Sequence, residues 1–239
     1  MAPTSLGDAL IVAVQSVKWD HNVSNFAAAG VSKERVATAA HMLALWSKQL
    51  ETADHGNRAL TFVREMQLQA QYGAALITLG LYKPAAANMR AVLESAMYYT
   101  YFRTHPTELE TLIRSPKYFL DKSTVVKFHN AHTVSFGDKE KSIKLSERLE
   151  QWYSSTSAII HGQIPGKWVK AASLKDVAFD KAICEDAVTA FEAAAELVHG
   201  LFLCTVDLVV WYQFSKPSKN ELLKSLSTAQ RKTFGLPSS

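Results

Sequence analysis

The sequence predicts an all-α protein built as a helical bundle. Apolar residues recur three and four positions apart over most of the 239 residues, which is the spacing of one buried helix face. Only 10 glycines and 7 prolines are present, too few for the turns of an all-β fold or for a disordered chain. The sequence contains no glycine-rich phosphate loop after a strand and no internal repeat. A chain of this length forms one large domain or two small ones.

Residues 1–56 are predicted to form an N-terminal helical extension. Its clearest helix begins with Ser32 as the expected N-cap and keeps apolar residues at helical spacing through Leu50. The breaker His55-Gly56 ends it. We expect this extension to pack either on the rest of the chain or on a second subunit.

Residues 57–214 are predicted to form an up-and-down bundle. The first helix runs from 57 to about 80, and the second runs from 84 to 105 with Pro84 at a position where proline is tolerated. Shorter helical pieces are expected between 108 and 136.

The second half of the bundle is predicted to contain two longer helices. One runs from about 138 to 161, and irregular or briefly extended chain follows over 163–178. A long helix over 180–214 closes the core, and residues 215–239 form a short basic helix and tail.

Charge is distributed unevenly along the chain, which has a formal net charge of +4. Residues 114–148 hold eight Lys or Arg against four Asp or Glu, and the tail from Lys216 holds five against one. Two interpretations remain open: these lysines are a solvated helix surface, or they form a weak face for a polyanion.

The cysteines and the apolar segments predict a cytoplasmic protein with no membrane partner. Cys184 and Cys204 lie on one predicted helix without a CxxC spacing, which indicates core thiols in a reducing compartment. The segment 197–214 is long enough to raise a membrane interpretation, but Asp207 inside it costs a few kcal/mol in lipid, so a buried helix is favoured. The apolar run near the N-terminus has no basic residue before it, and we predict no signal peptide.

Arg90 and Glu94 are the only charged residues between Lys83 and Arg103. Their spacing of four places them on one helix face, where they can pair. Two interpretations remain open: a structural ion pair that fixes the register of the helix, or an anion-binding Arg90 oriented by Glu94.

The stretch "QWYSSTSAIIHGQIPG" (151–166) carries a polar stripe that ends on a histidine. Helical spacing counted back from His161 gives Ser157, Ser154 and Glu150 on one face. The opposite face, Trp152, Thr156 and Ile159, suits a core. The polar stripe is either exposed or faces the Arg90–Glu94 pair. His161 itself also suits a helix C-terminus, where a cation is favoured and Gly162 ends the helix.

No metal or cofactor is predicted. His129 and His132 form an HxxH pair, but no nearby cysteine or firmly placed carboxylate completes a ligand set. Both histidines are expected at the surface.

Two of these segments together resemble the HEPN superfamily, including the HEPN-like proteins of bacterial and phage-defence loci. "YGAALITLGLYKPAAANMRAVLESAMYYTYF" resembles the helical hairpin of that superfamily, with an Arg-x-x-x-Glu on its second helix. "WYSSTSAIIHG" resembles its late helix ending in His-Gly, which is followed by an irregular link and a long last helix. The resemblance covers roughly residues 57–214 and rests on pattern more than on a strict motif.

The resemblance implies a metal-independent ribonuclease or toxin. In such proteins a histidine handles the 2′-hydroxyl or leaving-group proton, and an arginine separated from it by four to six intervening residues neutralises charge on the scissile phosphate. Here the positions for that arginine are Ser154, Ser155 and Thr156, so the motif arginine is absent. We hypothesise that Arg90 supplies its charge, which makes the expected catalytic set His161, Arg90, Glu94 and Ser157.

The resemblance also implies partners: a homodimer, RNA, and a partner protein of a bacterial defence or toxin–antitoxin system. Two alternatives to the enzyme remain open. The first is a non-catalytic scaffold, antitoxin or defence-complex subunit. The second is a helical bundle that holds a small anionic ligand against Arg90.

Overall fold

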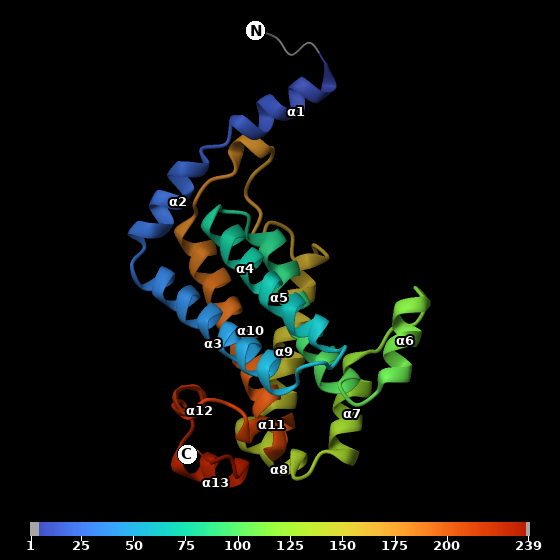
Figure 1. Ribbon diagram of the computed structural model, residues 1–239. Coiled ribbons are helices and arrows are strands. Elements are labelled where there is room, and N and C mark those ends of the chain that lie inside the picture. Colours follow the sequence, from blue (N-terminus) through green and yellow to red (C-terminus); the bar gives the residue numbers. More distant parts are fainter. Residues whose placement is uncertain (1–4, 238–239) are drawn as a thin grey trace.

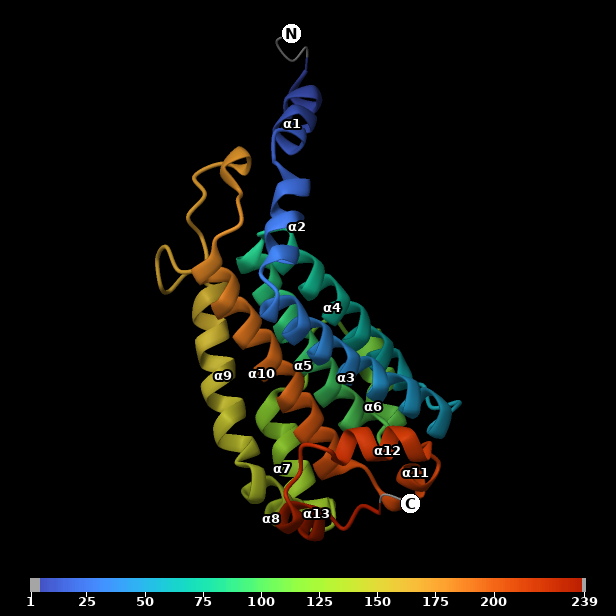
Figure 2. The same ribbon diagram turned by 90° about the vertical axis from the view of Figure 1, so that its left-hand side faces the viewer.

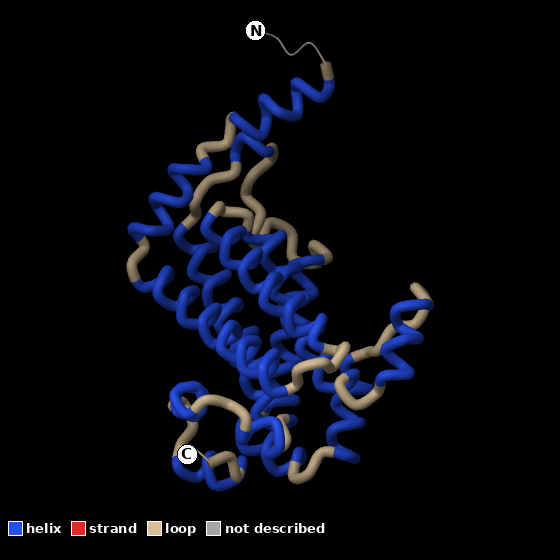
Figure 3. The backbone as a smooth tube through the Cα atoms, in the orientation of Figure 1, coloured by secondary structure: helices blue, strands red, loops and turns tan. Residues whose placement is uncertain are grey.

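The computed structural model describes residues 5–237, and within that range the chain forms helices and loops without a strand (Figures 1 and 3). The predicted all-α class is confirmed. The helices in chain order are α1 (Leu6–Gln15), α2 (Trp19–Ala28), α3 (Val31–Ala53), α4 (Leu60–Thr78), α5 (Tyr82–Phe102), α6 (Pro106–Arg114), α7 (Lys122–His132), α8 (Phe136–Ile143), α9 (Leu145–Ile160), the 3₁₀ turn η1 (Leu174–Asp176), α10 (Lys181–Thr205), α11 (Leu208–Tyr212), α12 (Lys216–Leu223) and α13 (Thr228–Phe234).

Five long helices, α3, α4, α5, α9 and α10, lie side by side and form the bundle (Figure 2). Helices α4 and α5 are joined by a tight turn in which Gly80 has a φ of 79°, a left-handed value that favours glycine. Pro84 lies in the first turn of α5, where its missing N–H has no helical partner to lose. Helix α10 contacts α3, α4, α5 and α9, so it is the central element of the core.

Helix α3 belongs to the bundle of its own chain, which is one of the two alternatives left open for residues 1–56. It packs against α4 and α10. Its Trp46 is fully buried, and Trp46 Nε1 donates a hydrogen bond of 2.9 Å to His199 Nδ1 on α10. The prediction that Ser32 caps this helix is wrong. The helix begins one residue earlier behind Gly30, and Ser32 is buried inside it, where its hydroxyl donates to Glu185.

Helices α1 and α2 form an arm that continues upward from α3 (Figure 1). None of the residues of α1 is buried. In α2, the buried side chain of Asn22 fixes the arm to two other segments. Asn22 Nδ2 donates to the carbonyl of Leu79 at 2.9 Å, and Asn22 Oδ1 accepts from the backbone N–H of Phe179 at 2.9 Å. One amide therefore ties the arm to the end of α4 and to the loop before α10.

The single helix predicted for 138–161 is two helices, α8 and α9. Lys144 separates them with a φ of 54°, a left-handed conformation that a lysine rarely adopts. Gly200 on α10 faces this junction. A Cβ at Gly200 would lie 2.8 Å from Ile143 Cδ1, so a larger residue there would require the Ile143 side chain to shift.

The single helix predicted for 180–214 is also interrupted, because α10 ends at Thr205. Asp207 Oδ1 accepts from the N–H of Val210 at 2.9 Å and so begins α11 as its N-cap. The carboxylate that argued against a membrane helix thus caps a new helix.

Helix α10 is long and apolar enough to cross a membrane, but 72% of its most apolar window is buried inside the bundle. A core helix of a soluble protein has this property. Both cysteines lie in α10 and are buried and unpaired, as predicted. Burial raises the pKa of Cys184 to about 11 and that of Cys204 to about 12, so both thiols stay protonated near neutral pH.

Candidate functional site

Arg90 and Glu94 form the ion pair that their spacing predicts. Arg90 Nε lies 2.8 Å from Glu94 Oε1, one turn along α5. The two side chains keep 28% and 42% of their surface exposed, so the pair lies at the edge of the bundle. Burial opposes the charge of Arg90, but the hydrogen bond and charge of Glu94 outweigh it and raise the pKa of Arg90 above its usual value.

Helix α9 faces this pair, as predicted for Ser157. Arg90 Nη1 donates to Ser157 Oγ at 3.3 Å. A residue that the sequence analysis missed, Tyr153, donates its hydroxyl to Glu94 Oε1 at 2.7 Å, and its ring centroid lies 4.5 Å from Arg90 Cζ. Tyr153 is four residues before Ser157, so its helical spacing was a signal for the shared face.

These side chains open into a cavity of about 480 Å³ between α5, α9 and the start of α7. The N-terminal residues of α7 supply a second cation, because Lys122 Nζ lies 4.6 Å from the Tyr153 ring centroid and pairs with Glu150. The remaining wall is mainly apolar and aromatic: Met97, Tyr98, Phe119, Leu120 and Val125. The site therefore combines two cations, each paired with one carboxylate, with an aromatic wall and the polar side chains of Asp121 and Ser123.

The guanidinium of Arg90 has more N–H donors than its contacts with Glu94 and Ser157 use. It has five N–H groups, and its contacts with Glu94 and Ser157 occupy one on Nε and one on Nη1. Neither of these two contacts uses Nη2. Arg90 can therefore accept an anionic ligand without breaking the contacts that orient it.

Tyr153 holds the centre of the site as a neutral phenol. Burial and its hydrogen bond to Glu94 raise the pKa of Tyr153 to about 12. Its hydroxyl thus remains a donor at neutral pH, and its ring offers a π face to both cations.

His161 is the one predicted site residue outside this network. It is exposed at the C-terminus of α9, and its backbone N–H donates to Ser157 O at 2.9 Å. Gly162 follows with a φ of 68°, so the predicted helix-ending role of His161-Gly162 is confirmed. Among the described residues no hydrogen bond or ion pair joins the His161 ring to Arg90, Glu94 or Ser157. The structure brings three of the four predicted residues together.

The burial of the other α9 residues can be compared with the two faces predicted for this helix. The predicted core face is buried: Trp152, Thr156 and Ile159. In the predicted polar stripe, Glu150 and Ser154 are exposed, and Ser157 is half-buried against α5. Exposure to solvent therefore explains Glu150 and Ser154, and the facing Arg90–Glu94 pair explains Ser157.

His129 was expected at the surface, and this prediction is wrong. Its side chain is 2% exposed, with Nδ1 at 2.8 Å from Thr133 Oγ1 and Nε2 at 3.0 Å from Thr100 Oγ1. Two threonine hydroxyls satisfy the ring nitrogens, which removes the cost of burying them. His132 is exposed as predicted. Within residues 5–237, no group of three or more His, Cys, Asp or Glu side chains is placed to hold a metal ion.

No protein-family model, no curated protein and no solved structure matches this chain. The HEPN resemblance therefore stays a prediction that rests on the two quoted segments.

Proposed function

We propose that the cavity at Arg90 binds single-stranded RNA. The observation that carries this proposal is the pair of cations, Arg90 and Lys122, lying against the Tyr153 ring at 4.5 and 4.6 Å beside an aromatic wall. Proteins that bind single strands combine cations for the phosphates with aromatic rings on which bases stack.

The charge distribution supports a polyanionic ligand at this face. The segment 114–148 contains α7, which borders the cavity, and its surplus of four basic residues equals the net charge of +4 of the whole chain. Phosphate binding releases counterions, so the affinity for RNA should fall steeply as salt rises.

The aromatic side chains at the cavity support base stacking. Phe119 lines the cavity and is 74% exposed, so its ring is accessible to a base. Tyr98 lines the same cavity and is half-buried. Because every base has a π face, we expect binding with weak sequence preference.

Replacing Arg90 or Lys122 with methionine should weaken binding of a fluorescent single-stranded RNA by about tenfold each, because each change removes a charge-assisted phosphate contact. Fluorescence anisotropy at low and high salt measures this, and the salt dependence should become shallower in both variants. Lys48→Met is the matched control, since Lys48 is exposed on α3 away from the cavity.

Lys48→Met should bind RNA as the wild-type protein does. An Arg90→Met protein that is folded by circular dichroism and still binds with wild-type affinity would rule out this cavity as the RNA site. Wild-type protein that binds no RNA at low salt would leave the scaffold and small-anion alternatives.

RNA cleavage is a second candidate function, favoured by the exposed position of His161 four residues after Ser157 on α9. In this reaction the 2′-hydroxyl gives up its proton and its oxygen bonds to the phosphorus, while the bond from phosphorus to the 5′-oxygen breaks and the 5′-oxygen takes up a proton, which leaves a 2′,3′-cyclic phosphate. His161 would move the proton and Arg90 would stabilise the charge on the phosphate.

His161→Ala should lower the cleavage rate by at least about a hundredfold in EDTA, because it removes the proton-transfer group, while RNA affinity stays the same. Gel analysis of a labelled RNA measures the rate. Intact RNA after long incubation with concentrated wild-type protein would exclude the enzyme, and equal rates in wild type and His161→Ala would assign the cleavage to another residue.

We also propose two kinds of partner on the basis of the HEPN resemblance: a second copy of the chain that completes the site, and a partner protein of a defence or toxin–antitoxin system. The predicted reducing compartment leads us to propose a cytoplasmic location. The buried, unpaired cysteines support the last of these.

A further inference from the structure

A second cavity, of about 590 Å³, lies where α5 and α10 end. It is enclosed by the ends of α5, α7 and α10, by α8, and by the C-terminal residues 233–236. It shares no lining residue with the Arg90 cavity. Its volume is in the range of cavities that hold small molecules.

The walls of this second cavity are apolar on several sides. The apolar side chains come from four separate segments and include Phe128, Val206, Phe234 and Leu236. Three of these four are buried in the core: Val206, Phe234 and Leu236. A ligand here would lose water from an apolar body on binding.

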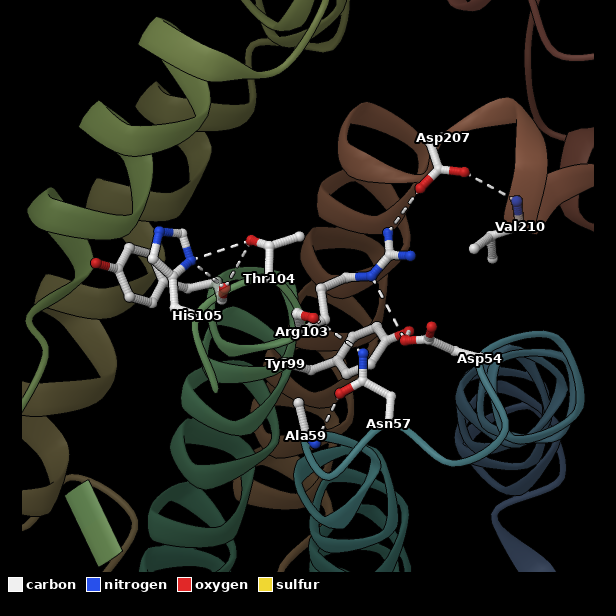
Figure 4. Close-up of polar contacts among 10 residues, drawn as sticks. Asp54, Asn57, Ala59, Tyr99, Arg103, Thr104, His105, Asp207 and Val210 are labelled. Carbon is white, nitrogen blue, oxygen red and sulfur yellow. Dashed lines mark hydrogen bonds and ion pairs between the residues drawn. The ribbon is translucent and has the colours of Figure 1, made fainter. Parts of the chain in front are cut away.

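Arg103 lines the cavity, but its charge is already balanced. Figure 4 shows its guanidinium between two carboxylates, with Nη1 at 3.0 Å from Asp207 Oδ2 and Nε at 3.5 Å from Asp54 Oδ2. Asp54 also accepts the hydroxyl of Tyr99 at 2.9 Å. This cluster joins the ends of α3 and α5 to the start of α11 and leaves Arg103 no charge for a ligand.

His129 also lines the cavity and is neutral. Burial, more than the nearby charge of Arg103, lowers its pKa to about 4. Its two nitrogens are already bonded to Thr100 and Thr133. It contributes a polar surface and no charge.

Lys139 is different, because it is a half-buried cation that no carboxylate balances. Its ammonium forms no hydrogen bond or ion pair within residues 5–237. Burial lowers the pKa of Lys139, and the ionisable neighbour that acts on its charge is the buried Cys204, whose thiol is neutral. A partly desolvated charge without a partner is costly, and an anion in the cavity would remove that cost.

We infer that this cavity binds a small organic carboxylate, with the carboxylate on the Lys139 ammonium and an apolar body against Phe128, Val206 and Phe234. The single unbalanced cation selects one negative charge, and the apolar walls select a ligand that is hydrocarbon over most of its length. This inference does not depend on RNA binding at Arg90.

Isothermal titration of the full chain with octanoate tests the inference. Octanoate should bind with one-to-one stoichiometry, and Lys139→Met should weaken it by about tenfold, because the variant keeps the length of the side chain and removes the charge. Octan-1-ol, which has the same body without the charge, should bind wild type and Lys139→Met equally. Lys141→Met is the matched control, since Lys141 is exposed on the same helix and does not line the cavity.

Lys141→Met should bind octanoate as wild type does, and both variants should keep the wild-type melting temperature within a few degrees in the absence of octanoate. Equal octanoate affinity in wild type and Lys139→Met would overturn the inference, as would the lack of saturable octanoate binding to wild type. If Lys139→Met fails to fold, a stepwise rise of wild-type melting temperature with octanoate but not with octylamine decides the same question.

Discussion

Replacing Arg103 with methionine should lower the free energy of unfolding by about 3–5 kcal/mol. Arg103 is 15% exposed and pairs with Asp54 and Asp207 at 3.5 and 3.0 Å (Figure 4). Its removal leaves Asp54, which is 16% exposed, without its cation. The ends of α3 and α5 and the start of α11 would lose their shared contact, since Asp207 also caps α11.

Urea denaturation followed by circular dichroism measures this loss. The matched control is Arg58→Met, because Arg58 pairs with Glu110 at the surface with side chains 60% and 52% exposed. That exposed pair should contribute less than about 1 kcal/mol. Equal losses in the two variants would show that burial of the Arg103 cluster adds no stability.

Lowering the pH from 6.5 to 4 should destabilise the protein through two buried histidines. Burial lowers the pKa of His129 and of His199 to about 4 from the ordinary 6.5. Between these values the unfolded chain binds a proton at each histidine that the folded chain does not, so stability is full above pH 6.5 and falls as pH drops toward 4. Each histidine accounts for about 3 kcal/mol over that window.

His199 has a structural reason to stay neutral. Its Nδ1 accepts the indole N–H of Trp46 at 2.9 Å, and a proton at that nitrogen would remove the acceptor. His199→Gln keeps an acceptor without the titration, so urea denaturation at several pH values should show a pH slope reduced by about one proton. His41→Gln, at an exposed position of α3, is the control that should keep the wild-type slope. An unchanged slope in His199→Gln would contradict a neutral buried His199.

Local patterns along the chain predict most of the helices because each helix of the bundle buries one face. The breaks inside the predicted long helices were missed for physical reasons. Lys144 adopts a left-handed conformation that favours glycine, so nothing in its residue type marks the end of α8. Asp207 is an N-cap residue in the middle of an apolar run, and the run outweighed it in the prediction.

The candidate site was predicted where the signal was local and missed where it depended on distant segments. Arg90 and Glu94 stand out because their helix is otherwise uncharged over many residues, and helical counting places Ser157 toward them. Tyr153 was missed because an aromatic residue at helical spacing is typical of a core. Lys122 comes from a different helix, and it reaches the Tyr153 ring because α7 and α9 both pack on α5.

Contacts between segments far apart in the sequence also explain the wrong prediction for His129 and the failure to predict the Arg103 cluster. His129 is buried because Thr100, 29 residues earlier, supplies a hydroxyl to it. Arg103 and Asp207 are 104 residues apart. Neither contact leaves a periodic pattern, because each joins side chains from different elements: α7 and α5 for His129 and Thr100, and the end of α5 and the start of α11 for Arg103 and Asp207.

Asn22 couples local unfolding of the N-terminal arm to local unfolding of the loop before α10. If α2 detaches, the N–H of Phe179 and the carbonyl of Leu79 lose their hydrogen bonds to the Asn22 amide together. The two segments should therefore exchange backbone amide protons as one unit. A protease that gains access to one should gain access to the other.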